Sequence, residues 1–305
     1  MKTNYEALVI GCGPSGITAA IELKNAGVDV ALIEKDAPGG KINIAPRVDN
    51  YPGYEKISGP DLAMVFVQRL FDANVEFIGD EVLSLTKEGD IFTLVCKRNT
   101  YTSKTVLLAT GTVEKKIGLP NEDKLFGHGL SYCALCDGHF FKGEDVAVIG
   151  GGDAALKEAL YLTTLVNKLY VIHRRNEFRG EEYILNELKS HANVEFLTPY
   201  DTLEILEENN KVSGLKIQNK ETKEIKILSI QGLFPLVGQN PNSKFIKIDN
   251  VVDEKGTVPF NEDMSTNVKG LYVAGDLTPR DIRQIYIAEP DGKNAAISMI
   301  KYLGK

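Results

Sequence analysis

The sequence contains two copies of a strand, a glycine-rich turn and a helix, and these copies constrain the fold more than any other feature. In the first copy, the apolar residues 7–10 lead into Gly11-Cys12-Gly13-Pro14-Ser15-Gly16. In the second, residues 146–149 lead into Gly150-Gly151-Gly152-Asp153-Ala154. A strand that turns tightly on glycine into a helix is typical of dinucleotide-binding units, where the helix N-terminus holds a pyrophosphate. The repeat predicts an α/β chain with two Rossmann-like nucleotide-binding domains.

Each copy ends its second strand on a polar residue at the same distance from its first glycine. Glu34 lies 23 residues after Gly11, and His173 lies 23 residues after Gly150. A carboxylate here accepts hydrogen bonds from ribose hydroxyls, so we expect FAD or NAD in the first unit. A cationic cluster suits the 2′-phosphate of NADP, which we expect in the second. That cluster consists of His173, Arg174, Arg175 and Arg179. A solvated charged surface is the alternative interpretation of it.

Two of the four cysteines form a Cys-x-x-Cys motif, Cys133-Ala134-Leu135-Cys136, followed directly by Asp137. Such a pair can close into a disulfide, and the local geometry lowers the pKa of one thiol when it opens. The pair can then pass two electrons to another disulfide by exchange, with Asp137 moving a proton. Half of a zinc site is the alternative. Zinc normally needs two more ligands at close spacing, whereas Cys12 and Cys96 are isolated, so we expect no metal.

Further turns rich in small or polar residues follow the apolar strands. They are Gly39-Gly40-Lys41, Asn50-Tyr51-Pro52-Gly53, Ala109-Thr110-Gly111, Gly275-Asp276 and Arg283-Gln284-Ile285. The second nucleotide-binding unit interrupts the first, with crossovers near residues 113–120 and 238–245. We therefore expect a discontinuous domain of residues 1–115 and 245–305, and an inserted domain of residues 116–244 that carries the cysteine motif.

Composition and charge exclude several classes of protein. The chain has 305 residues, enough for two cores. Its net charge of −7 argues against nucleic acid as a principal partner. No apolar run approaches the ~20 residues of a membrane helix, and a strand begins too early to leave room for a signal peptide. Four cysteines, two of them isolated, fit a reducing compartment. The expected location is therefore cytoplasmic.

Taken together and in this order, the motifs resemble the low-molecular-weight thioredoxin reductases, a family of flavoprotein disulfide reductases, over the whole chain. The resemblance implies FAD in the discontinuous domain and NADPH in the inserted domain. It also implies that hydride passes from NADPH to the flavin, and that electrons then pass through the disulfide to thioredoxin or a similar small disulfide protein. Cys136 would lie against the flavin, Cys133 would attack the substrate disulfide, and Asp137 would act as acid and base. The family's enzymes are homodimers that use a rotation between domains.

The resemblance also assigns the cofactor sites residue by residue. For FAD it implies Gly11, Gly13, Pro14, Ser15, Gly16, Glu34, Lys35, Gly39, Gly40, Lys41, Asn50, Ala109, Thr110, Gly111, Gly275, Asp276, Arg283, Gln284 and Ile285. For NADPH it implies Gly150, Gly152, Asp153, Ala154, His173, Arg174, Arg175 and Arg179.

Two departures from the family pattern leave the electron donor open. Lys41 stands where the family usually has Gln, and residues 288–292 read Ala-Glu-Pro-Asp-Gly where the family has Ala-Ala-Gly-x-Gly. We expect this segment to open a final helix over residues 292–303, with Glu289 and Asp291 facing outward as favourable N-terminal acids. Because the changes lie near the expected flavin, a ferredoxin-dependent flavin thioredoxin reductase that does not use NADPH is the alternative. The arginine cluster favours NADPH.

Three other classes of protein predict different features. A ferredoxin or flavodoxin–NADP reductase would lack the Cys-x-x-Cys motif, and a peroxiredoxin reductase component would carry an extra N-terminal module. A nucleotide-binding sensor without catalysis would not need Cys133. The motif itself therefore favours a disulfide reductase.

Overall fold

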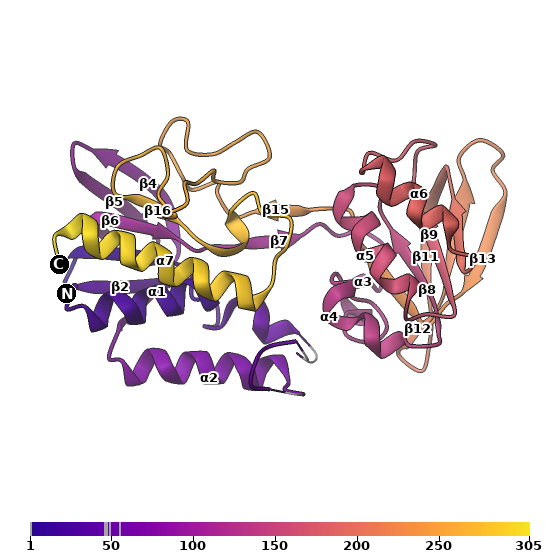
Figure 1. Ribbon diagram of the computed structural model, residues 1–305, viewed down its shortest axis with the longest axis horizontal. Coiled ribbons are helices and arrows are strands. Elements are labelled where there is room, and N and C mark those ends of the chain that lie inside the picture. The colour runs from indigo at the N-terminus through magenta and orange to yellow at the C-terminus, as the bar shows by residue number, and fades with distance from the viewer. Residues whose placement is uncertain (1, 46–47, 49, 55) are drawn as a thin grey trace. The chain divides into compact units, whose positions relative to one another are not determined.

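The computed structural model describes residues 2–45, 48, 50–54 and 56–305 (Figure 1). The chain forms two compact units, one of residues up to Val113 together with Asn240–Lys305, the other of Glu114–Gln239. The boundaries expected from the sequence, 115/116 and 244/245, differ from these by two and five residues. The two connections between the units, β7 (Thr112–Glu114) and β15 (Gln239–Pro241), pair with each other as a small sheet.

The first unit is built on a seven-stranded sheet in the order β3-β2-β1-β6-β5-β4, with β16 beside β6. Its strands are β1 (Asn4–Ile10), β2 (Val30–Glu34), β3 (Glu76–Gly79), β4 (Val82–Glu88), β5 (Ile91–Cys96), β6 (Thr100–Leu108) and β16 (Leu271–Val273). β1, β2, β3, β6 and β16 run parallel to one another, whereas β5 pairs antiparallel with both β4 and β6. Because parallel strands end at one edge of a sheet, the loops that follow β1, β2, β6 and β16 meet there.

Alternate residues of this sheet face two separate cores. Ala7 and Val9 of β1 pack with the helices α1 (Pro14–Asn25), α2 (Gly59–Asp72) and α7 (Ile285–Leu303). Leu8 and Ile10 pack on the other side, against the β4–β5 hairpin and the segment around residues 245–258. Since side chains alternate along a strand, one apolar run serves both faces, as expected for a parallel sheet covered on both sides.

The second unit repeats the plan on a smaller scale. Its parallel sheet has the order β10-β9-β8-β14 and lies beside an antiparallel sheet, β11-β12-β13. The strands are β8 (Asp145–Ile149), β9 (Lys168–Ile172), β10 (Val194–Leu197), β11 (Tyr200–Glu208), β12 (Lys211–Asn219), β13 (Ile225–Ser229) and β14 (Gly232–Pro235). The helices α5 (Asp153–Thr163) and α6 (Glu182–Ser190) cover one face, and the antiparallel sheet covers the other. Two Rossmann-like units, the second inserted into the first, are confirmed.

Short helical turns complete the chain. They are the α-helical α3 (Glu122–Leu125) and α4 (Ala134–Asp137), and the 3₁₀ turns η1 (Gly40–Ile44), η2 (Gly138–Phe141) and η3 (Gly275–Leu277). Within the described ranges, no helix combines the length and the apolar character needed to cross a membrane. The cysteine motif lies on α4, and the Gly275-Asp276 turn lies on η3.

The final helix and its two acids differ from the expectation. α7 begins at Ile285, not at residue 292, and Pro290 lies inside it. Asp291 is buried and pairs with Arg280 at 2.9 Å, and Glu289 accepts a hydrogen bond from the Tyr51 hydroxyl at 2.6 Å. The expectation of outward-facing acids is therefore wrong, because tertiary partners offset the cost of burying these carboxylates.

The core of the first unit generates a stability prediction. Phe66 and Phe71 both lie on α2, but Phe66 is 1% exposed and Phe71 is 51% exposed. Phe66→Ala should lower the free energy of unfolding by about 3–5 kcal/mol, because it removes a buried ring and leaves a cavity. Phe71→Ala is the matched control and should cost less than about 1 kcal/mol. Urea unfolding followed by circular dichroism measures both, and equal losses would contradict the assignment of Phe66 to the core.

Candidate active site

The glycine turn after β1 is required by close backbone contacts. Gly11 has a φ of +106°, and a Cβ atom there would lie 2.3 Å from the Ala109 carbonyl oxygen. A Cβ atom on Gly16 would lie 1.9 Å from the Gly11 oxygen. At Gly13, in contrast, no described atom beyond its chain neighbours lies within 4 Å of that position. Two glycines thus close the strand–helix junction, and the third leaves space above the N-terminus of α1, which begins with Pro14.

A second glycine turn lies against the first. The Gly39 N–H donates to the Cys12 carbonyl at 2.7 Å. A Cβ atom on Gly40 would approach the Gly13 Cα to 3.0 Å. Both Gly39 and Gly40 have positive φ angles, which glycine adopts without strain. Backbone from two loops therefore borders the space at Gly13.

The carboxylate of Glu34 is fixed at the end of β2 by backbone groups. The N–H of Cys12 donates to it at 2.8 Å, and the N–H groups of Lys35 and Asp36 donate at 2.8 and 2.9 Å. The Lys35 side chain is exposed and lies 3.9 Å from Asp36. Glu34 is thus held in one orientation at the edge of the sheet, where a carboxylate can still accept hydrogen bonds from hydroxyl groups.

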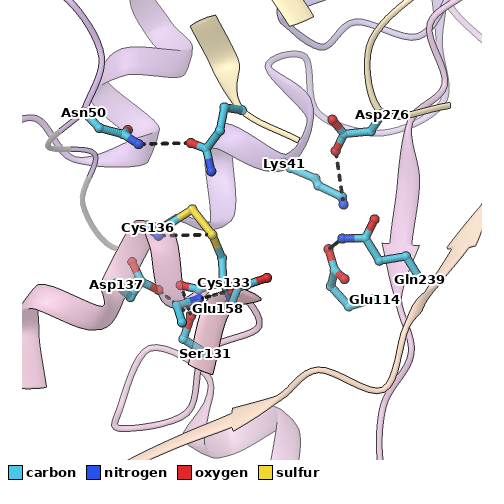
Figure 2. Close-up of a disulfide and its surroundings, with 12 residues drawn as sticks. Lys41, Asn50, Glu114, Ser131, Cys133, Cys136, Asp137, Glu158, Gln239 and Asp276 are labelled. Atoms are coloured by element: carbon cyan, nitrogen blue, oxygen red, sulfur yellow. Dashed lines mark hydrogen bonds and ion pairs between the residues drawn. A yellow bond between two sulfur atoms is a disulfide. The ribbon is translucent and has the colours of Figure 1, made fainter. Parts of the chain in front are cut away.

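The ends of β6 and β16 bring polar side chains to the same edge. Lys41 Nζ donates to Thr112 Oγ1 at 2.7 Å. The same Nζ lies 3.4 Å from the Asp276 carboxylate, a contact that Figure 2 shows. A Cβ atom on Gly111 would contact Asp276 at 4.0 Å, and one on Gly275 would lie 2.7 Å from Ser15 Oγ. The loops after β1, β6 and β16 therefore converge, as the parallel order requires.

Thr110 and Asn242 tie the loop after β6 to the returning chain. Thr110 Oγ1 donates to the Asn242 carbonyl at 2.7 Å, and Asn242 Nδ2 donates to the Thr110 carbonyl at 2.9 Å. Asn242 was not among the residues predicted from the sequence. The pair positions the loop, so the hydroxyl of Thr110 is already engaged.

The start of α7 closes this edge. Asn50 Nδ2 donates to Gln284 Oε1 at 3.0 Å (Figure 2), and Gln284 is the N-cap of α7, whose first residue is Ile285. Arg283 Nε is buried and has no hydrogen-bond partner among the described residues. An orphaned buried donor is the kind of group that a bound ligand satisfies.

In the second unit the glycine turn after β8 has the same arrangement as the turn after β1: one glycine is required by a close contact and another leaves space at a helix N-terminus. A Cβ atom on Gly150 would lie 2.5 Å from the Leu236 oxygen, whereas a Cβ atom on Gly152 would have no described atom beyond its chain neighbours within 4 Å. Asp153, the first residue of α5, accepts a hydrogen bond from the Glu181 N–H at 2.7 Å. The Arg179 N–H donates to the Gly151 carbonyl at 2.7 Å. The segment with Arg179 is therefore anchored on the glycine turn, beside the N-terminus of α5 and the exposed Ala154.

His173 plays a different part from its arginine neighbours. Its ring stacks on Phe178 at 5.2 Å and lies so close to Gly151 that a Cβ atom there would be 2.4 Å away. Burial lowers the pKa of His173, and the charges of Arg179, Arg175 and Arg174 lower it further. The His173 ring is therefore uncharged near pH 7 and packs against the glycine turn. The positive charge resides on the three arginines, which are exposed.

Cys133 and Cys136 are joined as a disulfide (Figure 2). Cys133 is the N-cap of α4, and its sulfur accepts a hydrogen bond from the Cys136 N–H at 3.1 Å. A charge that forms on the Cys133 sulfur after reduction would be stabilised by that N–H. The bonded state fits a redox pair, in which neither sulfur serves as a metal ligand.

Asp137 is connected to the cysteine loop through a serine. Its carboxylate is buried and accepts a hydrogen bond from Ser131 Oγ at 2.6 Å. The Cys133 N–H donates to the same Oγ atom at 3.1 Å. Sequence reasoning missed Ser131 and also Glu158, whose carboxylate contacts the backbone of Ala134. A single Glu in a helix has no sequence signature that would reveal such a contact.

Comparisons with known proteins agree with this arrangement. The model of the pyridine nucleotide-disulphide oxidoreductase family matches residues 5–292. The thioredoxin reductase of Mycoplasma pneumoniae is 39% identical over 297 residues, which cover 97% of this chain and 94% of that protein.

Solved structures give the same result. The crystal structure of thioredoxin reductase from Streptococcus pyogenes has a TM-score of 0.93 and 36% identity, and the match covers 100% of this chain and 99% of that one. A ferredoxin-flavin thioredoxin reductase from Clostridium acetobutylicum has a TM-score of 0.54 and 28% identity, covering 99% and 98%. The resemblance inferred from the motifs is confirmed: the chain belongs to the pyridine nucleotide-disulphide oxidoreductase family and, within it, to the thioredoxin reductases.

Proposed function

We propose that this protein reduces thioredoxin, or a similar small disulfide protein, with NADPH as electron donor and FAD as internal carrier. A bound flavin accepts two electrons from a reduced nicotinamide and passes them to a disulfide. The observation that carries the proposal is the disulfide Cys133–Cys136. It lies in a unit that has its own glycine turn and arginines, and the other unit has a second glycine turn at the end of its parallel strands.

The residues of the first unit fit FAD. The space at Gly13, the N-terminus of α1 and the Gly39-Gly40 backbone would hold the pyrophosphate. Glu34 would accept the ribose hydroxyls and Asp276 the ribityl hydroxyls, while the orphaned Arg283 Nε offers a donor. Of the other predicted FAD residues, Ala109, Thr110 and Gly111 lie on the loop after β6 and Asn50 bonds to Gln284, while the rest lie on the loops and helix N-termini already named.

The residues of the second unit fit NADPH. Gly150, Gly152 and Asp153 open α5, where the pyrophosphate would rest. The exposed guanidinium groups of Arg174, Arg175 and Arg179 would pair with the 2′-phosphate, since planar guanidinium groups suit phosphate oxygens. His173 would shape the turn without adding charge.

The chemistry of the cysteines follows from their positions. Opening the Cys133–Cys136 bond yields a thiol and a thiolate, and the N–H of Cys136 favours the charge on Cys133. Cys133 would attack the partner's disulfide and form a mixed disulfide, and Cys136 would then attack Cys133 and release the reduced partner. Asp137, held by Ser131, would move the proton.

The finer parts of the proposal depend on composition and on the family. The buried free thiols of Cys12 and Cys96 fit a reducing compartment such as the cytoplasm. A homodimer follows from the family resemblance alone. A ferredoxin-dependent reductase is the second candidate, favoured by the similarity to the Clostridium acetobutylicum protein, but the exposed Arg174, Arg175 and Arg179 favour NADPH.

Anaerobic mixing tests the electron donor. The flavin-loaded protein is mixed in turn with NADPH, NADH and reduced ferredoxin, and flavin absorbance is followed. NADPH should bleach the flavin fastest, because the arginines pair with the 2′-phosphate that NADH lacks. Bleaching by ferredoxin alone would overturn the proposal and favour the second candidate.

The arginines make the donor preference testable by substitution. Arg175→Ala and Arg179→Ala should each raise the KM for NADPH about tenfold to a hundredfold, since a hydrogen bond to a charged group contributes about 1.5–3 kcal/mol. The KM for NADH should stay the same. Lys189→Ala, an exposed cation on α6, is the matched control. Equal changes with both nucleotides would show that the arginines do not read the phosphate.

Cysteine variants distinguish the roles of the two sulfurs. Cys136→Ser should trap a mixed disulfide between Cys133 and thioredoxin, because the second thiol needed for release is missing. Cys133→Ser should form far less of it. Both variants should lose thioredoxin reduction yet keep NADPH oxidation with a small one-electron acceptor. Non-reducing electrophoresis detects the trapped complex, and trapping only by Cys133→Ser would reverse the assignment.

A further inference from the structure

Glu158 acts on an element other than its own helix. It lies on α5, the helix that starts at the second glycine turn, yet its carboxylate accepts a hydrogen bond from the Ala134 N–H at 2.5 Å. The Leu135 N–H also lies close enough to lower the pKa of Glu158. These two N–H groups belong to the residues between Cys133 and Cys136. A carboxylate therefore holds the backbone between the two redox sulfurs (Figure 2).

Packing fixes this arrangement at both ends of α4. Ala134 is fully buried in the apolar cluster that includes Leu156 and Ala159 of α5. At the other end, a Cβ atom on Gly138 would lie 2.7 Å from the Leu162 side chain. The turn that carries the disulfide thus sits directly on α5, and Glu158 keeps its contact as long as the turn stays in place.

Glu158 has a carboxylate neighbour that affects its charge. Glu114 of β7 lies near enough to raise the pKa of Glu158, and the turn of α4 carries the two cysteines and the Asp137 carboxylate. Burial raises the pKa of Glu158 to about 7, the N–H groups of Ala134 and Leu135 oppose that rise, and Glu114 adds to it. A further negative charge on the same turn would favour the protonated form of Glu158 still more.

We propose that Glu158 is a positioning residue of the redox step: it holds the disulfide turn and takes up a proton when the disulfide opens. The S–S bond breaks with two electrons, and one sulfur takes a proton and becomes a thiol. The other remains a thiolate, and protonation of the Glu158 carboxylate offsets its charge. The electrons come from the reduced nicotinamide in the enzyme, or from a small dithiol in the test. The inference rests on the proposed function only in that the disulfide is redox-active.

The proposed proton uptake changes how the reduction of the disulfide depends on pH, and the direction of that change can be measured. Below about pH 7 the Glu158 carboxyl is largely protonated in the disulfide form, so reduction takes up no further proton there. Above that pH, the disulfide form holds a carboxylate and the reduced form a carboxylic acid. Reduction then consumes up to one proton more than the thiols alone. Each pH unit therefore disfavours reduction by up to an additional tenfold, or ~30 mV for this two-electron couple.

The experiment is a redox titration of the flavin-loaded protein against dithiothreitol buffers between pH 6 and 9. Alkylation and mass measurement count the reduced Cys133–Cys136 pair, so the readout does not depend on NADPH or thioredoxin. Above pH 7, the equilibrium constant for reduction should fall more steeply with pH in the wild type than in Glu158→Gln, by up to tenfold per pH unit. Because dithiothreitol supplies the electrons here, a negative result in this titration is distinguishable from a negative result in the anaerobic mixing experiment with NADPH.

Control variants separate proton uptake from support of the fold. Glu187→Gln, which removes an exposed carboxylate from α6, should match the wild type. Glu158→Asp keeps a titrating carboxylate and should restore the steeper pH dependence if Glu158→Gln has lost it. If wild type and Glu158→Gln differ by a constant factor at every pH, Glu158 only supports the turn and the proposal is overturned. If Glu158→Gln does not fold, Glu158→Asp carries the test. The pH at which the equilibrium constant begins to fall more steeply should then be shifted in Glu158→Asp, while wild type and Glu187→Gln should show equal slopes. An unshifted pH in Glu158→Asp overturns the proposal.

Discussion

The close contact between a strand end and the helix that follows it is the constraint on which the other features depend. At Gly16, even a single added carbon would meet the Gly11 carbonyl at 1.9 Å, and at Gly11 it would meet Ala109 at 2.3 Å. These contacts bring the loops after β1 and β6 together and leave the N-terminus of α1 facing open space. The same junction recurs at Gly150 in the second unit. Each unit therefore presents backbone N–H groups and a helix N-terminus where its parallel strands end.

A second theme is the use of carboxylates to hold turns by their backbone N–H groups. Glu34 accepts three such bonds at the end of β2. Glu122 accepts the N–H groups of Ile117 and Gly118, as well as the Tyr132 hydroxyl next to the cysteine motif. Glu158 does the same for α4. A charged acceptor strengthens each bond, so a few acids fix the loops that carry the chemistry.

The pKa of a buried carboxylate depends on its degree of burial and on the neighbouring charges. Burial and the nearby Glu114 raise the pKa of Glu158 to about 7. At Asp291, burial also raises the pKa, while Arg280 opposes the rise by pairing with the carboxylate. A partner of opposite charge makes a buried acid structural, whereas a neighbour of like charge leaves it ready to bind a proton. This contrast explains why Glu158, and not Asp291, is suited to respond to a redox change.

The sequence by itself determined the features that depend on neighbours along the chain. The spacing of the glycines, the acid after β2, the arginines after β9 and the Cys-x-x-Cys motif each reflect the geometry of a few consecutive residues. They were sufficient to predict two Rossmann-like units and the family. Only the tertiary structure decided the contacts between distant segments and their effects: the bond from Asn50 to Gln284, the bond from Tyr51 to Glu289, the burial of Asp291 and the start of α7 at Ile285. These depend on which elements pack together, and a carboxylate such as Glu158 has no local pattern that states its partner.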